Sequence, residues 1–395
     1  MIAYTHYPSD PRVRREAETL VSTQDYDVTF IVPKIQSRSR EYIMDGVNVI
    51  ELNALQYRGK SQKRYILSYL NFLARAFFAC TKLFVTRRID LFHVHNMPNF
   101  LVLSCLIPRL FGKKIILDMH DPVPELFAVK FNSTKKVLFK LLCWEEFLCS
   151  RFVHHIICVN HVQREAIVSR GIPESKISIS MNVPDHKRFN SNGNNNAEKK
   201  VSQKFKLVYH GTLVHRLGID LTIHAVARLL NNIRNLDFEI IGSGDDSDDL
   251  IRLVNSLKIG DHVHICDYVP VEKLPMRLSH MDIGVVSNRN NIATELMLPV
   301  KMLEYVVLNI PVVAPRIRAI QYYFDEDMVS YFEPENVNSL AKAISELYHD
   351  VAKREKQVQT ARKFIEKYGW ENHQSDLINL YENLSNGRAE STPLT

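Results

Sequence analysis

The sequence contains few cysteines, and their arrangement does not suggest a metal site. Six cysteines occur among 395 residues, with no Cys-x-x-Cys pair and no His/Cys ladder at metal-ligand spacing. We therefore expect buried thiols in a reducing compartment and no zinc or other metal site. The cysteines are Cys80, Cys105, Cys143, Cys149, Cys158 and Cys266.

Long apolar runs and a leader segment are also missing. No stretch reaches the ~18 uninterrupted apolar residues that a membrane span requires. Met1 leads within a few residues into the charged run 10–16, which is unlike a signal peptide. These two absences make a cytoplasmic protein the expectation.

Charge of one sign is not in large excess over the whole chain, but it is unevenly distributed. The net charge is +6, and residues 1–190 carry 27 Lys and Arg against 17 Asp and Glu, whereas residues 191–395 carry 23 against 27. A basic first half suits a membrane surface, a phosphorylated acceptor or nucleic acid, although solvated lysines would give the same numbers. Because no nucleic-acid-binding motif accompanies the basic excess, we expect no nucleic-acid partner.

What the sequence does contain is a regular alternation of strand-like and helix-like segments. The chain is 46% apolar and longer than the ~250–300 residues at which single cores stop growing, which indicates two domains. The alternation predicts an α/β fold of two tandem, Rossmann-like, doubly wound domains with a ligand-binding cleft between them. The predicted strands are 2–5, 27–32, 47–52, 91–95, 114–117, 155–159 and 177–180, followed by 206–209, 238–242, 262–266, 283–286, 311–314 and 328–332.

The boundary between the domains is predicted at a linker over residues 191–204. This region is polar, rich in asparagine and without apolar periodicity. The domains would then comprise residues 1–190 and 205–370, with a final helix and tail over 371–395. The last helices are predicted at 339–349, 352–367 and 373–384.

Two strand-to-helix loops of the second half carry residues suited to a phosphate group. Gly211 would let the backbone approach a ligand, and Arg216 could pair with a diphosphate, although an arginine here is as often a surface ion-pair partner. Gly242 and Gly244 form a Gly-x-Gly turn after the next strand. This turn permits close approach to a ribose or phosphate, but an ordinary turn would need the same residues.

The most informative segment of the second half surrounds a predicted helix over 299–308. Pro299 suits its first position, and Asn309 suits the left-handed cap that follows its end. Free N–H groups at the start of this helix and Lys301 in its first turn would make an anion site. Glu304, one turn further on, could accept hydrogen bonds from ribose hydroxyls or form an exposed i, i+3 ion pair with Lys301.

In the first half, residues 117–125 close a predicted buried strand with polar side chains and prolines. His120 could orient a sugar or donate a hydrogen bond at this strand end, whereas His93 and His95 on the preceding strand are expected to be structural. Asp10 is expected to cap the helix that follows it, in a loop that could also face phosphate.

Together these motifs resemble the GT-B fold glycosyltransferases of the large retaining family 4, the glycosyl transferases group 1. Each motif is weak alone, but the combination is specific and extends over nearly the whole chain. The motifs are Asp10-Pro-Arg12, Asp118-Met-His120-Asp121, Gly211-Thr-Leu213, Gly242-Ser-Gly244, Leu298-Pro-Val-Lys301-Met-Leu-Glu304-Tyr305 and Pro311-Val-Val313. The resemblance implies an acceptor-binding first domain, a donor-binding second domain and C-terminal helices that cross back to the first domain.

The implied activity is retaining transfer of a hexose-type sugar from a nucleoside-diphosphate sugar, most commonly a UDP-sugar, without a metal or other cofactor. The implied acceptor is a glycan or a lipid-linked glycan, as in surface polysaccharide or glycoconjugate synthesis. By the same resemblance, Arg216 and Lys301 would neutralise the diphosphate, Glu304 would bind the ribose, Glu295 would approach the donor sugar, and His120 would contact that sugar from the first domain. The implied donor-binding set is Gly211, Arg216, Gly242, Gly244, Leu296, Met297, Leu298, Lys301 and Glu304.

The sequence departs from the family pattern at two positions. Eight residues separate Glu295 from Glu304, where the family usually has seven, and Leu217 stands where a lysine is common. The eight-residue spacing keeps one alternative open, a catalytically inactive GT-B scaffold or binding subunit. A nucleotide-sugar epimerase with the same fold is a second enzymatic alternative.

Two segments of the first half, 60–85 and 135–144, mix basic with bulky apolar residues. Such segments can lie on an anionic membrane surface, but they can also be ordinary helices packed on the sheet, and packing is favoured for the second. A peripheral membrane contact would suit an acceptor carried on a polyprenyl diphosphate.

Overall fold

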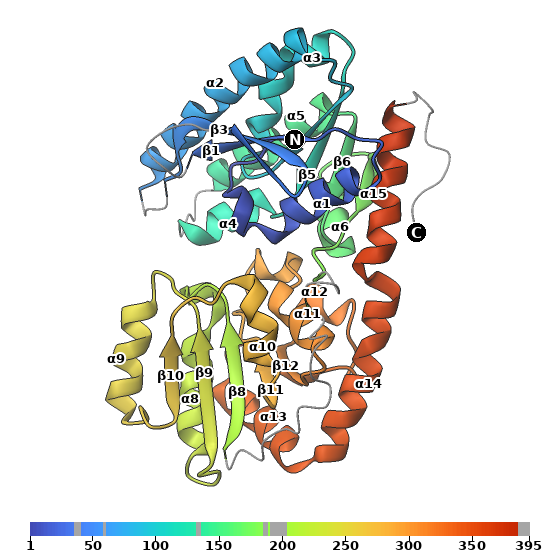
Figure 1. Ribbon diagram of the computed structural model, residues 1–395. Coiled ribbons are helices and arrows are strands. Elements are labelled where there is room, and N and C mark those ends of the chain that lie inside the picture. Colours follow the sequence, from blue (N-terminus) through green and yellow to red (C-terminus); the bar gives the residue numbers. More distant parts are fainter. Residues whose placement is uncertain (35–40, 58–60, 132–135, 185–188, 190–203, 386–395) are drawn as a thin grey trace. The chain divides into compact units, whose positions relative to one another are not determined.

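The computed structural model describes residues 1–34, 41–57, 61–131, 136–184, 189 and 204–385 (Figure 1). The chain divides into two compact units, one made of Met1–Asn182 with Glu371–Thr395 and the other of Val183–Trp370. Except for Lys204, the predicted linker over 191–204 lies outside the described residues, as does the end of the predicted tail.

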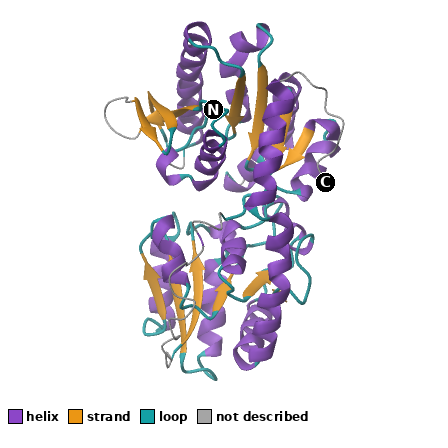
Figure 2. Cartoon of the chain, turned by 45° about the vertical axis from the view of Figure 1, so that its right-hand side comes forward, coloured by secondary structure: helices purple, strands orange, loops and turns teal. Residues whose placement is uncertain are grey.

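The first unit contains parallel strands flanked by helices (Figure 2). One sheet has the order β4-β5-β6-β7 and is parallel throughout, and the other has the order β1-β3-β2 with β2 antiparallel to β3. Ile2 forms isolated bridges to Ile31 and Val94, so it connects the two sheets. The strands are β1 (Thr29–Lys34), β2 (Glu41–Met44), β3 (Val47–Leu55), β4 (Leu91–His95), β5 (Lys114–Met119), β6 (His155–Cys158) and β7 (Ile177–Ile179).

Two details of this unit differ from the sequence prediction. The strand predicted at 2–5 is reduced to the bridges made by Ile2, because the chain turns into a short 3-10 helix, η1 (Tyr7–Ser9), soon afterwards. Strand β2 was not predicted, because Glu41 and Ile43 are exposed and the segment lacks the continuous apolar run of a buried strand.

Helices cover the strands of the first unit. Pro11 opens α1, and the Asp10 carboxylate accepts from the Arg12 and Val13 amides, so Asp10 caps this helix as expected. Residues of α2, η2 and α5 share one core with β4 and β5, whereas α1 packs against β1 and β3. The helices are α1 (Pro11–Ser22), α2 (Gln62–Thr86), η2 (Asn99–Cys105), α3 (Leu106–Leu110), α4 (Val123–Lys130), α5 (Lys136–Phe152), α6 (His161–Ser169), η3 (Glu174–Lys176) and α15 (Trp370–Ser385).

The second unit contains one parallel six-stranded sheet with the order β10-β9-β8-β11-β12-β13. All its strands were predicted to within two residues at each end. Residues of β8, β9, α8 and α13 lie in one continuous apolar core. The strands are β8 (Phe205–His210), β9 (Leu236–Ile241), β10 (Val263–Cys266), β11 (Ile283–Val285), β12 (Val312–Pro315) and β13 (Ser330–Phe332).

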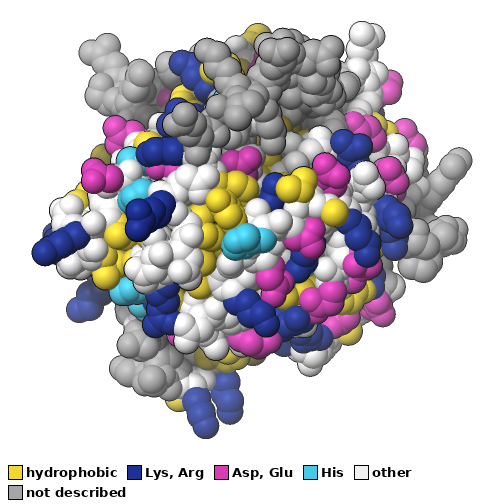
Figure 3. Space-filling view, turned by 90° about the horizontal axis from the view of Figure 1, so that it is seen from below, with side chains coloured by type: hydrophobic (Ala, Val, Ile, Leu, Met, Phe, Trp, Pro, Cys, Tyr) yellow, Lys and Arg dark blue, Asp and Glu magenta, His cyan; other side chains and the backbone are white. Residues whose placement is uncertain are grey.

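The helices of the second unit follow the strands, as expected for a doubly wound fold. They are η4 (His215–Leu217), α8 (Ile219–Leu229), α9 (Ser247–Leu257), η5 (Val271–Lys273), α10 (Leu274–Leu278), η6 (Thr294–Leu296), α11 (Val300–Val307), α12 (Arg318–Gln321), α13 (Val337–His349) and α14 (Val351–Tyr368). The face seen in Figure 3 carries Lys and Arg side chains interspersed with Asp and Glu, so no patch of one charge sign dominates it.

The six cysteines are free thiols, of which Cys143 and Cys266 are partly exposed and the other four are buried. Within the described residues, no helix combines the length and the apolar character that crossing a membrane requires.

Candidate functional site

The loops that carry the predicted donor-binding residues meet at one edge of the second unit. Since its six strands are parallel, their carboxyl ends all lie at this edge. Gly211 follows β8, and Gly242 follows β9. Helix α11 begins after β11, which is two strands further along the chain. The fold therefore places these predicted residues at the edge where α/β proteins bind ligands.

The glycines of this edge hold two loops against each other. The Gly211 amide donates to Ile241 O (2.9 Å), and the Leu213 amide donates to Ser243 O (3.0 Å). A Cβ on Gly242 would overlap the Gly211 carbonyl oxygen, and one on Gly244 would overlap that of Leu213. The close packing of the two backbones is sufficient to require glycine at positions 242 and 244. Contacts of these glycines with a ribose or a phosphate remain a prediction.

Lys301 places an ammonium group beside these loops. Its Nζ donates to the Tyr209 hydroxyl (2.7 Å) and lies 3.9 Å from the centre of the Tyr209 ring. It is also next to Gly211, where an added Cβ would lie 3.4 Å from Lys301 Nζ. Burial lowers the pKa of Lys301 to about 7, a shift that Glu304 opposes and Arg216 increases. Lys301 makes no ion pair among the described residues, so an anion bound here would be a direct partner that favours the charged form of this lysine.

Arg216 adds a second cation to the same region. Arg216 lies on the short helix η4, which ends directly before Gly218. The φ of Gly218 is 61°, a conformation that suits glycine and lets α8 begin at the next residue. The Nε of Arg216 is buried without a hydrogen-bond partner in the described part of the chain. The arginine is close enough to contribute to the lowered pKa of Lys301. The two predicted diphosphate-binding cations are therefore within electrostatic range of each other.

Glu304 does not form the i, i+3 ion pair with Lys301. Its Oε2 lies 3.1 Å from His210 Nε2, and both side chains are largely buried. Helix α11 is fixed to β8 by Tyr305, whose hydroxyl donates to Val208 O (3.3 Å) and accepts from the His210 amide (3.2 Å). Tyr209 and His210 were not predicted as residues of this site. Their position immediately before Gly211 was the available signal.

The start of α11 agrees with the prediction to within one residue. Pro299 is the N-cap rather than the first helical residue, and Asn309 has a φ of 58°, which confirms it as the left-handed residue after the helix. The Leu296 and Met297 amides donate to Ala293 O (3.1 Å) and Thr294 O (3.2 Å) within the preceding turn. Two residues of the implied donor-binding set, Leu296 and Met297, therefore already use their backbone amides within the protein.

Glu295 lies on η6, and its carboxylate caps another helix. Its Oε2 accepts from the Arg318 amide (2.8 Å) at the start of α12. The N-cap residue of α12, Ile317, makes no side-chain cap of its own, so the Glu295 carboxylate supplies one at a helix end where negative charge is favourable. The role of Glu295 at the donor sugar remains a prediction. Its observed function is structural, because its carboxylate caps α12.

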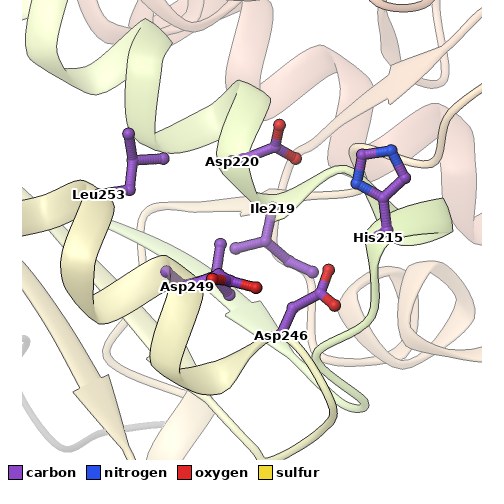
Figure 4. A pocket seen from close by; sticks show the side chains of 7 residues that line it. His215, Ile219, Asp220, Asp246, Asp249 and Leu253 are labelled. Carbon is purple, nitrogen blue, oxygen red and sulfur yellow. The ribbon is translucent and has the colours of Figure 1, made fainter.

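An acidic pocket of about 320 Å³ lies between the starts of α8 and α9 (Figure 4). His215, Asp220, Asp246 and Asp249 are among the residues that line it. Burial raises the pKa of Asp246, an effect that His215 opposes and the neighbouring aspartates increase. Because its carboxylates repel a diphosphate, this pocket is a poorer site for that group than the region of Lys301 and Arg216.

In the first unit, His120 lies at the carboxyl end of β5 and belongs to a buried charged network. Its Nε2 is 2.9 Å from Asp118 Oδ2 and 3.0 Å from His95 Nδ1. The Arg12 guanidinium donates to both Asp118 oxygens, with Nη2 2.8 Å from Oδ1. Glu16 Oε1 lies 3.3 Å from Arg12 Nε. Of these side chains, only His120 has appreciable exposure, at 17%.

Burial and charge shift the pKa values of this network in different directions. Burial acts to raise the pKa of Asp118, but Arg12 and His120 hold it well below its usual range. Burial acts to lower the pKa of His120, but Asp118 and Glu16 raise it above its ordinary value. Burial raises the pKa of Glu16 to about 7, with Asp118 adding to the shift.

The same network contains the group of potential metal ligands found within the described residues. Ligand atoms of Glu16, His93, His95 and Asp118 all lie within 4.8 Å of one another. However, the Arg12 guanidinium already contacts both carboxylates, and a divalent cation among them would be repelled by this fixed charge. These residues therefore fit an internal ion-pair network better than a metal centre.

Comparison with known proteins covers both halves of the chain. Residues 12–188 match the family model described as Glycosyltransferase Family 4, and residues 191–364 match the model described as Glycosyl transferases group 1. The phosphatidylinositol N-acetylglucosaminyltransferase gpi3 subunit of Schizosaccharomyces pombe is 28% identical over 184 residues. That match covers 46% of this chain and 37% of the length of the relative.

Solved structures agree with the fold. Sucrose-phosphate synthase from Thermosynechococcus elongatus has a TM-score of 0.77 at 18% identity, covering 98% of this chain and 99% of that chain. HepE from Anabaena in complex with UDP has a TM-score of 0.70 at 11% identity, covering 97% and 98%. The predicted α/β fold with two Rossmann-like domains and the resemblance drawn from the motifs are confirmed. The chain belongs to the group 1, or family 4, glycosyltransferases and has the GT-B fold.

Proposed function

We propose that the protein transfers a hexose-type sugar from a UDP-sugar to a glycan or lipid-linked acceptor, with retention of anomeric configuration and without a metal. The observation that carries the proposal is the pair of cations, Lys301 and Arg216, at the carboxyl edge of the second sheet. A diphosphate bound there would restore the full charge of Lys301 and give Arg216 Nε a partner. The two cations would stabilise the negative charge that develops on the leaving group.

The nucleoside would extend from the diphosphate toward α11. Glu304 has one carboxylate oxygen at His210, which leaves the other oxygen for a ribose hydroxyl. Uridine is favoured because HepE, which has the same fold, was solved with UDP and with UDP-glucose. A lipid-linked acceptor is favoured by the name of the fission yeast relative, an N-acetylglucosaminyltransferase subunit that acts on phosphatidylinositol. His120 and Glu295 are proposed to approach the donor sugar.

A nucleotide panel tests the donor site. We expect UDP or a UDP-sugar, added without metal, to raise the melting temperature of the wild type by several degrees, and Glu304→Ala to remove most of this shift. GDP and ADP serve as competing nucleotides, and Glu346→Ala on the exposed side of α13 is the matched control. If no nucleotide stabilises the wild type, the scaffold alternative gains support. Release of nucleotide only when an acceptor is present would argue against an epimerase.

A peripheral membrane contact is part of the proposal, because two helices of the first unit expose apolar residues beside basic ones. On α5, Val137, Leu141, Trp144 and Leu148 are 70%, 55%, 62% and 44% exposed and follow one helical stripe. Thus the helix for which the sequence favoured packing carries a regular exposed apolar face. The corresponding exposed apolar residues of α2 are Ile66, Leu67, Leu70, Phe78 and Val85, and exposed basic residues of the two helices include Lys63, Arg64, Lys136 and Lys140.

Vesicle flotation tests this contact. The wild type should float with vesicles of phosphatidylcholine and phosphatidylglycerol more than with phosphatidylcholine alone, because the basic residues favour anionic lipid. Changing Leu141 and Trp144 together to serine should lower the partition coefficient by about 10- to 100-fold, since the burial of two large apolar side chains is lost. Ile251→Ser, an exposed apolar position on α9, is the control. Equal flotation of the wild type and the Leu141/Trp144 double variant would exclude α5 as the membrane contact.

A further inference from the structure

The loop that follows β11 holds the backbone of η4, the short helix that carries Arg216. The carbonyl oxygens of all three η4 residues accept hydrogen bonds from this loop. Arg289 Nε donates to His215 O (3.1 Å), and the Arg289 amide donates to Arg216 O (3.0 Å). The hydroxyl of Ser287 donates to Leu217 O (3.0 Å). The position of η4 is therefore set by a segment about 70 residues further along the chain.

The guanidinium of Arg289 also connects η4 to two further elements. Its Nη2 lies 2.6 Å from Asp220 Oδ2 in the first turn of α8 (Figure 4). Its Nη1 lies 3.1 Å from Glu335 Oε2, two residues before α13 begins. Each of the three nitrogens thus has an acceptor within the second unit, and the planar group is held in one orientation. With 15% of its side chain exposed, Arg289 is suited to hold loops together.

The main-chain carbonyl of Arg289 holds the segment that leads to α11. It accepts from Thr294 Oγ1 (2.6 Å), and Thr294 is buried at the start of η6. Asn291 Oδ1 accepts from the Ala293 and Thr294 amides (3.0 Å each) and closes this turn. Helix α11, with Lys301 in its first turn, begins four residues after η6 ends. Arg289 therefore connects the loops that carry the two predicted diphosphate-binding cations.

We propose that Arg289 is a positioning residue that orients Arg216 toward the diphosphate of the donor by holding the backbone of η4. The inference rests on the proposed function and deepens it, because it names a residue that sets the geometry of the anion site without contacting the donor. Arg216 depends on such support, since its Nε is buried and has no hydrogen-bond partner in the part of the chain that the structure describes. All these residues belong to the second unit.

A positioning role and a simple charge effect predict opposite results for Asp220→Asn. This substitution removes a negative charge from the region, so charge alone would strengthen the binding of an anion. It also weakens the ion pair that holds the Arg289 guanidinium. Positioning therefore predicts weaker binding of the anion in this variant.

Calorimetric titration with UDP and with inorganic pyrophosphate, at one fixed salt concentration, tests the proposal. Arg289→Gln should raise the dissociation constant about tenfold in the otherwise wild-type chain but less than about twofold when Arg216 is replaced by alanine. Asp220→Asn should raise it about threefold in the first background only. Arg354→Gln is the matched control, because Arg354 also donates to main-chain carbonyls, at the end of α13, and should leave binding unchanged.

Hydrogen exchange without any ligand measures the hold on η4 directly. The amides of Leu217 and Gly218 close the η4 turn, and they should exchange at least about tenfold faster in Arg289→Gln than in the wild type. The Arg354 variant should not change their exchange. Ser287→Ala removes the contact to Leu217 O without a change of charge, so it should speed up the same amides and serves if Arg289→Gln does not fold.

The outcomes separate the two proposals. Unchanged exchange in Arg289→Gln, tighter anion binding in Asp220→Asn, or equal weakening by Arg289→Gln with and without Arg216 would each overturn the positioning role. If the wild type binds pyrophosphate but transfers sugar from no donor, the proposed function is wrong, and the pyrophosphate titrations still test Arg289. If the wild type binds neither UDP nor pyrophosphate, both proposals are wrong.

Discussion

Replacing Lys301 with methionine is expected to abolish nucleotide binding while making the protein more stable. The ammonium has no anionic partner among the described residues, and burial lowers its pKa to about 7. Loss of the charge-assisted contact to the diphosphate should weaken binding by about 100-fold or more. Methionine fills a similar volume, and Tyr209 keeps its hydrogen bond to Thr212 O (2.8 Å).

The gain in stability follows from the direction of the pKa shift. The unfolded chain keeps the ordinary lysine pKa of about 10.5, so between pH 7 and that value the unfolded state holds more protons than the folded one. Stability therefore rises with pH across this range, and the penalty for the charged lysine, on the order of a few kcal/mol, is largest below pH 7. We expect Lys301→Met to melt about 5 °C higher than the wild type at pH 6, with less difference at pH 9.

The same linkage predicts proton uptake on donor binding. A diphosphate raises the pKa of Lys301, so at pH 8 the complex holds up to one proton more than the free protein, and affinity falls as the pH rises above 7. Calorimetric titration with UDP in two buffers of different ionisation enthalpy measures this uptake. Lys342→Met, an exposed lysine change on α13, should leave binding and melting unaltered. Unchanged UDP affinity in Lys301→Met would refute the assignment of this lysine to the diphosphate.

The sequence was most informative where one physical cause controls local structure. Parallel strands buried on both faces have continuous apolar runs, and β11 and β12 of the second unit are buried at every residue, which is why these two strands could be placed closely. Asn309 was predicted as the left-handed residue after α11 because few non-glycine side chains tolerate that conformation. Strand β2 escaped prediction because an antiparallel, half-exposed strand has a weaker pattern.

The candidate site could be predicted only in part, since its residues act through partners far away in sequence. Lys301 and Arg216 were identified from their positions at loop and helix starts, but the contact of Lys301 with Tyr209 spans 92 residues. Arg12 and Asp118 are 106 residues apart, and nothing in the spacing of either motif indicates the other. The sequence therefore located the loops that carry the candidate site residues. The partners that set the charge of those residues lie far away in sequence and could be identified only from the fold.

Replacing Gly242 with alanine is expected to give a large loss of stability. Its φ of 149° is one that a side chain rarely adopts, and an added Cβ would overlap the Gly211 carbonyl oxygen. Strained backbone and overpacking against a main-chain atom together should cost about 3–5 kcal/mol, which corresponds to a melting temperature lower by roughly 10 °C for a unit of this size. Thermal unfolding followed by circular dichroism measures the change.

Gly260→Ala is the matched control, because no atom lies within 4 Å of a Cβ at that position. Gly260→Ala should change the free energy of unfolding by no more than about 1 kcal/mol. The change can be a small stabilisation, because alanine restricts the conformations of the unfolded chain. Equal melting of the two variants would show that the backbones after β8 and β9 do not need to touch. If only Gly242→Ala is unstable, then the loop carrying Gly211 is held in place by backbone contact with the next loop, and Lys301 is provided with a fixed surface without help from a bound nucleotide.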